Sequence, residues 1–60
     1  MFNEYKDIVT VKETAEMLRM KQYRVYDLIN RGLLKRLNTG KPYLIPKTEV
    51  IRFVEQLVIE

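Results

Sequence analysis

The sequence contains no cysteine, no histidine and no serine. The absence of cysteine excludes disulfide bonds and thiolate zinc sites, and the absence of histidine removes imidazole as a base or metal ligand. Serine and cysteine nucleophiles are missing as well. With only 60 residues, the chain is too short to enclose a deep pocket around its carboxylates, lysines, tyrosines and threonines. We therefore expect a protein that is not an enzyme and that has no catalytic residues, metal or cofactor.

Long apolar runs are also absent. No stretch approaches the ~20 apolar residues that a membrane span requires. The first residues, Met1 to Glu4, lack the basic and apolar regions of a signal peptide. Two glycines and two prolines are too few for a disordered linker, and 47% hydrophobic residues are ordinary for a folded chain. We expect residues 1–60 to form one cytoplasmic domain with no membrane partner.

The net charge of +3 is unevenly distributed along the chain. Residues 19–47 hold eight basic side chains and one acidic side chain, Asp27, a net charge of +7. The two flanks hold three basic and seven acidic side chains, a net charge of −4. A basic middle between acidic ends is typical of a protein that binds a polyanion, and the acidic flanks should face away from it. Charge alone does not separate nucleic acid from an acidic protein or lipid surface.

A strand and a helix are expected near the N-terminus. Residues 7–11 form a β-prone run, and Thr10 with Glu13 completes a T-x-x-E capping box. Thr10 can accept from the Glu13 amide while Glu13 reaches back to the Thr10 amide, so a helix begins near Val11. The carboxylates of Glu13 and Glu16 share one helix face, and capping and solvation explain them better than acid–base catalysis. The inward residues are Val11, Thr14, Ala15 and Leu18.

A second helix is expected after a break at residues 19–21. Its apolar residues, Val25, Leu28 and Ile29, recur at helical spacing. Gly32 is placed to end this helix in the left-handed conformation.

The next part of the chain is predicted as a return to the core followed by a hairpin. Leu33 and Leu34 are the apolar residues of the return, and Asn38 and Gly40 suit a loop that needs positive φ. The two short strands and the loop between them are residues 35–37, 43–45 and 38–42, respectively.

Pro46 is suited to the opening of a third helix, because the missing N–H of proline would have no partner there. The expected core stripe of this helix is Val50, Phe53, Val54 and Leu57, widened by Ile51 and Val58. Ile51, Val58 and Ile59 are explained most simply as core and as the end of the helix. They also offer a contact surface for a second copy or another protein.

The first two helices fit the register of a helix-turn-helix. This motif requires a small residue where its helices pack closely and apolar residues at set offsets. Its ninth position usually holds glycine and here holds Arg19, whose left-handed conformation would cost roughly 1 kcal/mol. With Val11 as the first position, the residues that fit are Val11, Ala15, Leu18, Met20, Val25 and Leu28.

Taken together, these segments resemble the small excisionase-type DNA-binding domains, relatives of the MerR-type winged helix-turn-helix proteins. The resemblance rests on residues 8–18, 25–34 and 43–47 and covers roughly Ile8 to Gln56. It implies a mainly α fold with a small β-hairpin, in which three short helices and a wing form a winged helix-turn-helix. The second helix would enter the major groove, and the wing would lie over the adjacent backbone or minor groove. Lys21 departs from the pattern, because a serine or threonine commonly caps this helix, a cap worth about 1 kcal/mol.

The outward face near the start of the second helix supplies the candidate base contacts. Gln22 can read adenine and Arg24 can read guanine through bidentate hydrogen bonds. Asp27 either accepts from a cytosine amino group or pairs with Arg24 or Arg31 on the same helix. The recognition-helix candidates are Lys21, Gln22, Tyr23, Arg24 and Asp27, of which Lys21 and Tyr23 are assigned to phosphates.

Backbone contacts are expected from the wing and from the ends of the helices. The wing candidates are Lys35, Arg36, Asn38, Thr39 and Lys41. The further phosphate candidates are Thr10, Lys12, Tyr26 and Arg31. Tyr26 and Tyr43 can instead be packing residues that expose only a hydroxyl.

These features predict a protein that binds double-stranded DNA and is associated with the nucleoid in a prokaryotic or phage setting. The excisionase resemblance implies binding near the end of a mobile element, often by several copies, bending of the DNA, and direction of an integrase toward excision. A small transcriptional regulator of a phage or plasmid operon would present the same contacts. A third hypothesis is a protein-interaction module that turns its basic face toward an acidic partner.

Overall fold

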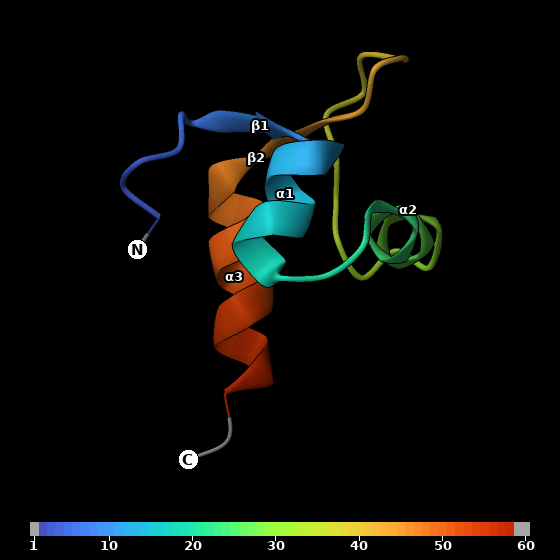
Figure 1. Cartoon of the computed structure of the whole chain (residues 1–60). Coiled ribbons are helices and arrows are strands. Elements are labelled where there is room, and N and C mark those ends of the chain that lie inside the picture. The colour runs from blue at the N-terminus through green and yellow to red at the C-terminus, as the bar shows by residue number, and fades with distance from the viewer. Residues whose placement is uncertain (1, 59–60) are drawn as a thin grey trace.

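The structure is a computed structural model that describes residues 2–58 (Figure 1). Within these residues, three helices and a two-stranded antiparallel sheet form a mainly α winged helix-turn-helix, the fold class that the sequence predicts. Figure 1 shows α1 and α3 beside the sheet and α2 set apart on one side of them. In chain order the elements are β1 (Ile8–Thr10), α1 (Val11–Leu18), α2 (Gln22–Asn30), β2 (Leu44–Pro46) and α3 (Lys47–Leu57).

The predicted capping box starts α1. Thr10 Oγ1 accepts from the Glu13 amide at 3.1 Å, and Glu13 Oε1 accepts from the Thr10 amide at 3.0 Å. One turn later the Thr14 hydroxyl donates to the Thr10 carbonyl at 2.9 Å, which satisfies a fully buried polar side chain. These bonds fix the first turn of a helix that, at eight residues, is too short to be stable alone.

The turn between α1 and α2 depends on Arg19, which adopts the left-handed conformation with φ 56° and ψ 47°. The Arg19 amide donates to the Glu16 carbonyl at 3.2 Å. The Met20 amide donates to the Ala15 carbonyl at 3.0 Å, which gives the bond pattern of a Schellman motif. Lys21 precedes α2 and makes no side-chain capping bond. The helix-turn-helix therefore forms without the usual glycine and without a hydroxyl cap.

The sheet joins the start of the chain to the entry of α3. β1 and β2 pair antiparallel, with Val9 opposite Ile45, and both residues are fully buried. The Lys47 amide donates to the Asp7 carbonyl at 2.7 Å just beyond the last strand pair. Pro46 is the N-cap of α3 rather than its first helical residue. The sheet thus fixes where α3 begins.

The predicted strand at residues 35–37 is wrong, because these residues belong to an irregular segment, residues 35–43, that we call the wing loop. The Leu37 amide donates to the Leu44 carbonyl at 2.8 Å. The Leu37 carbonyl accepts from Arg36 Nη1 at 3.1 Å, so a side chain occupies the acceptor that would extend a strand ladder. Of the two loop residues expected to have positive φ, Gly40 does (78°) and Asn38 does not.

The core lies between the sheet and the inner faces of the helices. It includes Met17, which the predicted stripe of α1 omitted. Leu33, expected in the core, is 55% exposed, because it lies in the bend after Gly32, where its side chain faces solvent and only that of Leu34 is buried. Leu57 and Val58 are each 60% exposed, because the last turn of α3 extends past the other elements (Figure 1). Ile59 lies outside the described residues. The buried apolar residues are Val9, Val11, Ala15, Met17, Val25, Leu34, Ile45 and Val50.

Candidate nucleic-acid interface

α2 buries one face and exposes the opposite one. The residues turned toward the core are Val25, Leu28 and Ile29, as predicted. Helical spacing places Tyr23, Asp27 and Asn30 at the centre of the opposite face, and Tyr23 is 66% exposed. Asn30 is not among the contacts predicted from the sequence. It follows Asp27 by three residues and Tyr23 by seven, and this helical spacing is the signal that places it on the same face.

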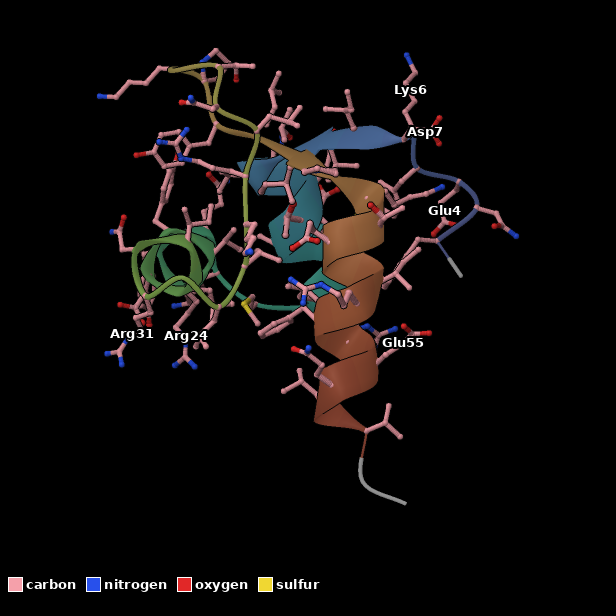
Figure 2. The ribbon with its side chains drawn as sticks, turned by 180° about the vertical axis from the view of Figure 1, so that it is seen from behind. Glu4, Lys6, Asp7, Arg24, Arg31 and Glu55 are labelled. Atoms are coloured by element: carbon pink, nitrogen blue, oxygen red, sulfur yellow. The ribbon has the colours of Figure 1, made fainter. Side chains whose placement is uncertain are left out.

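Two arginines lie along one edge of this exposed face. Arg24 and Arg31 project from the same side of α2, away from the wing loop (Figure 2). Arg31 Nε donates to Asp27 Oδ2 at 2.9 Å, so Asp27 pairs with Arg31 one turn later in the chain. Both side chains are at least half exposed, and such pairs contribute only about 0.5 kcal/mol. The pair can therefore open at little cost when a phosphate or base approaches.

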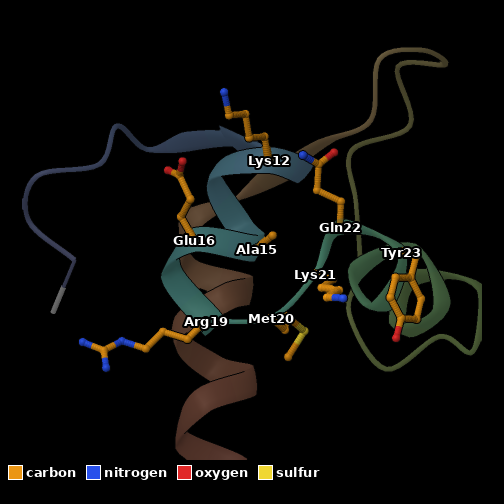
Figure 3. A pocket seen from close by; sticks show the side chains of 8 residues that line it. All are labelled: Lys12, Ala15, Glu16, Arg19, Met20, Lys21, Gln22 and Tyr23. Atoms are coloured by element: carbon orange, nitrogen blue, oxygen red, sulfur yellow. The ribbon is translucent and has the colours of Figure 1, made fainter.

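A groove lies between α1 and the first turn of α2 (Figure 3). Among the described residues that line it, Ala15 and Met20 supply apolar surface, Glu16 is acidic, and Lys12, Arg19 and Lys21 are basic. The Arg19 side chain extends from the end of α1 away from α2. The lining residues are Lys12, Ala15, Glu16, Arg19, Met20, Lys21, Gln22 and Tyr23. Four predicted contacts, Lys12 of α1 and residues 21–23 at the start of α2, thus line one hollow.

Aromatic contacts hold the wing loop against α2. The rings of Tyr26 and Tyr43 lie 5.5 Å apart between centroids, tilted by 59°. Arg36 Cζ lies 4.2 Å from the centroid of the Tyr43 ring. Tyr43 is half-buried, whereas Tyr26 is 44% exposed, so Tyr26 both packs and presents surface. A second hollow at this junction is lined by Tyr26, Lys41, Pro42 and Tyr43.

The remaining predicted contacts differ in how accessible they are. Four of the five wing candidates, Lys35, Asn38, Thr39 and Lys41, are exposed. Arg36 is half-buried against Tyr43. Near the start of α1, Lys12 is exposed at the groove, whereas Thr10 already takes part in the capping box. Lys12 is therefore better placed than Thr10 to meet a phosphate.

Some acidic side chains of the flanks lie away from α2, whereas Glu16 lines the groove beside it. Glu4 and Glu55 are both distant from α2 in Figure 2. Burial raises the pKa of the Tyr5 phenol above its ordinary value of 10.0, and the nearby carboxylates of Glu16, Glu4 and Glu13 raise it further. Carboxylates therefore gather near Tyr5, where Lys47 Nζ also donates to the Tyr5 carbonyl at 3.1 Å, whereas Arg24 and Arg31 project from α2 on the other side of the molecule (Figure 2).

Two helices joined by a tight turn, with the second helix exposed and flanked by a wing, define a helix-turn-helix DNA-binding domain. Residues 8–58 match the family model described as Helix-turn-helix domain, and the chain belongs to this family. Comparisons with curated proteins and with solved structures gave no match. Membership of this family supports sequence-specific DNA binding. Among residues 2–58, no helix is long and apolar enough to cross a membrane.

Proposed function

We propose that this protein is an excisionase-type factor that binds and bends the DNA at the end of a mobile element and directs an integrase toward excision. α2 enters the major groove, and the wing loop lies over the adjacent backbone. The observation that supports this most strongly is the exposed face of α2 with a basic wing loop held beside it through Tyr26 and Tyr43. Glu4 and Glu55 add to the support, because they lie away from α2 and would not repel phosphates there.

The first turns of α2 read the bases. The N-terminal residues of a recognition helix reach furthest toward base edges, which assigns Gln22 to adenine and Arg24 to guanine. Lys21 and Tyr23 line the protein groove between α1 and α2, and they contact phosphates of one DNA strand. The phosphate contacts elsewhere come from Lys12, Tyr26 and Arg31 and from Lys35, Asn38, Thr39 and Lys41 of the wing loop.

A module of this size makes few base contacts, so its affinity for one site is limited. Adjacent copies on the same DNA, and the integrase itself, add the affinity that one copy lacks. Bending a site costs on the order of 1–6 kcal/mol and is offset by the additional contacts that it permits.

The experiment that tests this role combines bending with recombination. A duplex of element-end DNA labelled at both ends should show increased energy transfer when the protein binds. If a neighbouring gene encodes an integrase, that integrase should excise the element faster in the presence of this protein. Binding without bending, together with an unchanged rate of excision, would contradict the excisionase role. Binding to an operon promoter with no dependence on integrase would identify the second candidate, a small transcriptional regulator.

A further inference from the structure

We propose that Arg36 positions the wing loop on α2 and does not contact DNA. This inference rests on the proposed DNA-binding function and assigns a different role to one of its expected phosphate contacts. The Arg36 guanidinium lies over the Tyr43 ring, with Cζ 4.2 Å from the centroid. Its Nη1 donates to the Leu37 carbonyl at 3.1 Å. Half-buried and bonded in this way, Arg36 is the least available cation of the wing loop.

The contacts of Arg36 continue into the recognition helix. Tyr43 packs on Tyr26, in the middle of α2, at 5.5 Å between ring centroids. Arg36, Tyr43 and Tyr26 therefore form a continuous row of contacts, which we call the aromatic stack although the two rings are tilted, from the start of the wing loop through its end to α2. The Leu37 amide closes the base of the loop on the Leu44 carbonyl at 2.8 Å. The aromatic stack and this hydrogen bond together hold the wing loop in place, as the strand ladder would in a regular hairpin.

The position of the exposed wing cations depends on this stack. Lys41 and Pro42 line the same hollow as Tyr26 and Tyr43, so the two tyrosines set how far Lys41 lies from α2. Arginine suits this role because its planar group can stack on a ring and donate a hydrogen bond at the same time. Lysine keeps the charge but has no planar face. Substitution of Arg36 by lysine therefore removes the stacking contact while keeping the positive charge.

The test compares Arg36→Lys and Arg36→Ala with the native protein on element-end DNA over a salt series. A positioning role predicts that both variants lose about two- to fivefold in affinity, the range expected for one exposed cation–π contact. It also predicts that the slope of log K against log salt stays unchanged, because the wing cations still reach their phosphates in the complex and only the cost of ordering the loop on binding rises. Tyr43→Leu should reproduce the loss, and Tyr43→Phe, which keeps the ring, should not. Lys41→Ala is the matched control and should reduce the slope by about 0.9, the amount expected for one phosphate contact.

A second measurement needs no DNA. Amide hydrogen exchange of Leu37 in the free protein should be faster in Arg36→Lys and Tyr43→Leu than in the native protein, and unchanged in Lys41→Ala. Native affinity and native Leu37 exchange in Arg36→Lys, with a reduced slope in Arg36→Ala, would show that Arg36 is a phosphate contact and overturn the proposal. If the native protein binds no DNA, the proposed function fails, while the exchange data still decide whether Arg36 holds the wing loop.

Discussion

Arg19 occupies at the end of α1 the place that Gly32 occupies at the end of α2. Both residues are left-handed, with φ of 56° and 76°. In both cases the amide of the next residue donates at 3.0 Å to a carbonyl five residues earlier, Met20 to Ala15 and Leu33 to Leu28. The same cap is therefore built once with glycine and once with a residue that carries a Cβ. Only the cap at Arg19 has a steric cost, because glycine has no Cβ.

Replacing Arg19 with glycine should stabilise the protein. The left-handed conformation costs a residue with a Cβ roughly 1–2 kcal/mol, and glycine gives back part of this through its greater freedom in the unfolded chain. We expect Arg19→Gly to raise the free energy of unfolding by about 0.5 to 1 kcal/mol. Urea denaturation measures this change. Arg19→Ala is the control, and an equal gain in that variant would mean that the side chain, not the backbone, is the source of the cost.

Removing the cap of α1 should destabilise the fold. Thr10→Ala deletes the hydroxyl that accepts from the Glu13 amide at 3.1 Å, and losing such a cap typically costs about 1 kcal/mol. Thr10→Ser keeps the acceptor and should stay close to the native protein. Thermal unfolding followed by circular dichroism compares the three proteins. Equal melting temperatures for Thr10→Ala and the native protein would contradict this account of the start of α1.

The ion pair on α3 should make stability depend on acid pH. Arg52 Nη2 donates to Glu49 Oε1 at 2.8 Å, and this hydrogen bond is the main reason why the pKa of Glu49 lies below its ordinary value of 4.5. A lowered pKa in the folded state means that the contribution is complete above pH 4.5 and is lost as pH falls through the folded value. Glu49→Gln should therefore be less stable at pH 7, by about 0.5 kcal/mol, and should match the native protein in strong acid.

Urea denaturation at a series of pH values tests this expectation. Glu55→Gln is the matched control, because it removes one exposed carboxylate from the same helix. A constant difference between Glu49→Gln and the native protein at all pH values would argue against the ion pair as its cause.

Base contacts and backbone contacts should respond differently to substitution. We expect Arg24→Ala to lower the discrimination between a specific and a random duplex by about 1–3 kcal/mol. Lys41→Ala should weaken binding to both duplexes about equally. Competition binding with the two duplexes gives both quantities. Identical effects of the two substitutions on specific and random DNA would show that the division between α2 and the wing loop is wrong.

Local signals in the sequence were sufficient for the helix-turn-helix. The Thr10–Glu13 box and the glycine at position 32 act over a few residues, so the start of α1 and the end of α2 were predictable. The pairing of β1 with β2 was not predictable, because it joins segments more than 30 residues apart, and the wing was expected to pair with itself instead. Leu57 lies on the predicted core face of α3 but is exposed. Helical spacing predicts which residues share a face, but it does not predict whether another element packs against that face.

The candidate contacts were predictable as a set, but not in their arrangement. Charge and helical spacing identified the exposed cations of α2 and the wing. The aromatic stack was missed, because the contact between Tyr26 and Tyr43 depends on how the wing loop folds back. The sequence allows either Arg24 or Arg31 as the partner of Asp27, and the geometry of α2 selects Arg31.

The most direct test of sequence-specific DNA binding is fluorescence anisotropy with element-end and random duplexes over a series of salt concentrations. If five or six phosphates are neutralised, log K should fall with log salt at a slope of about −5, from roughly −0.9 for each contact. The element-end duplex should bind more tightly than the random duplex at every salt concentration. A flat salt response, or no binding at low salt, would contradict the account and favour a protein-interaction module with an acidic partner.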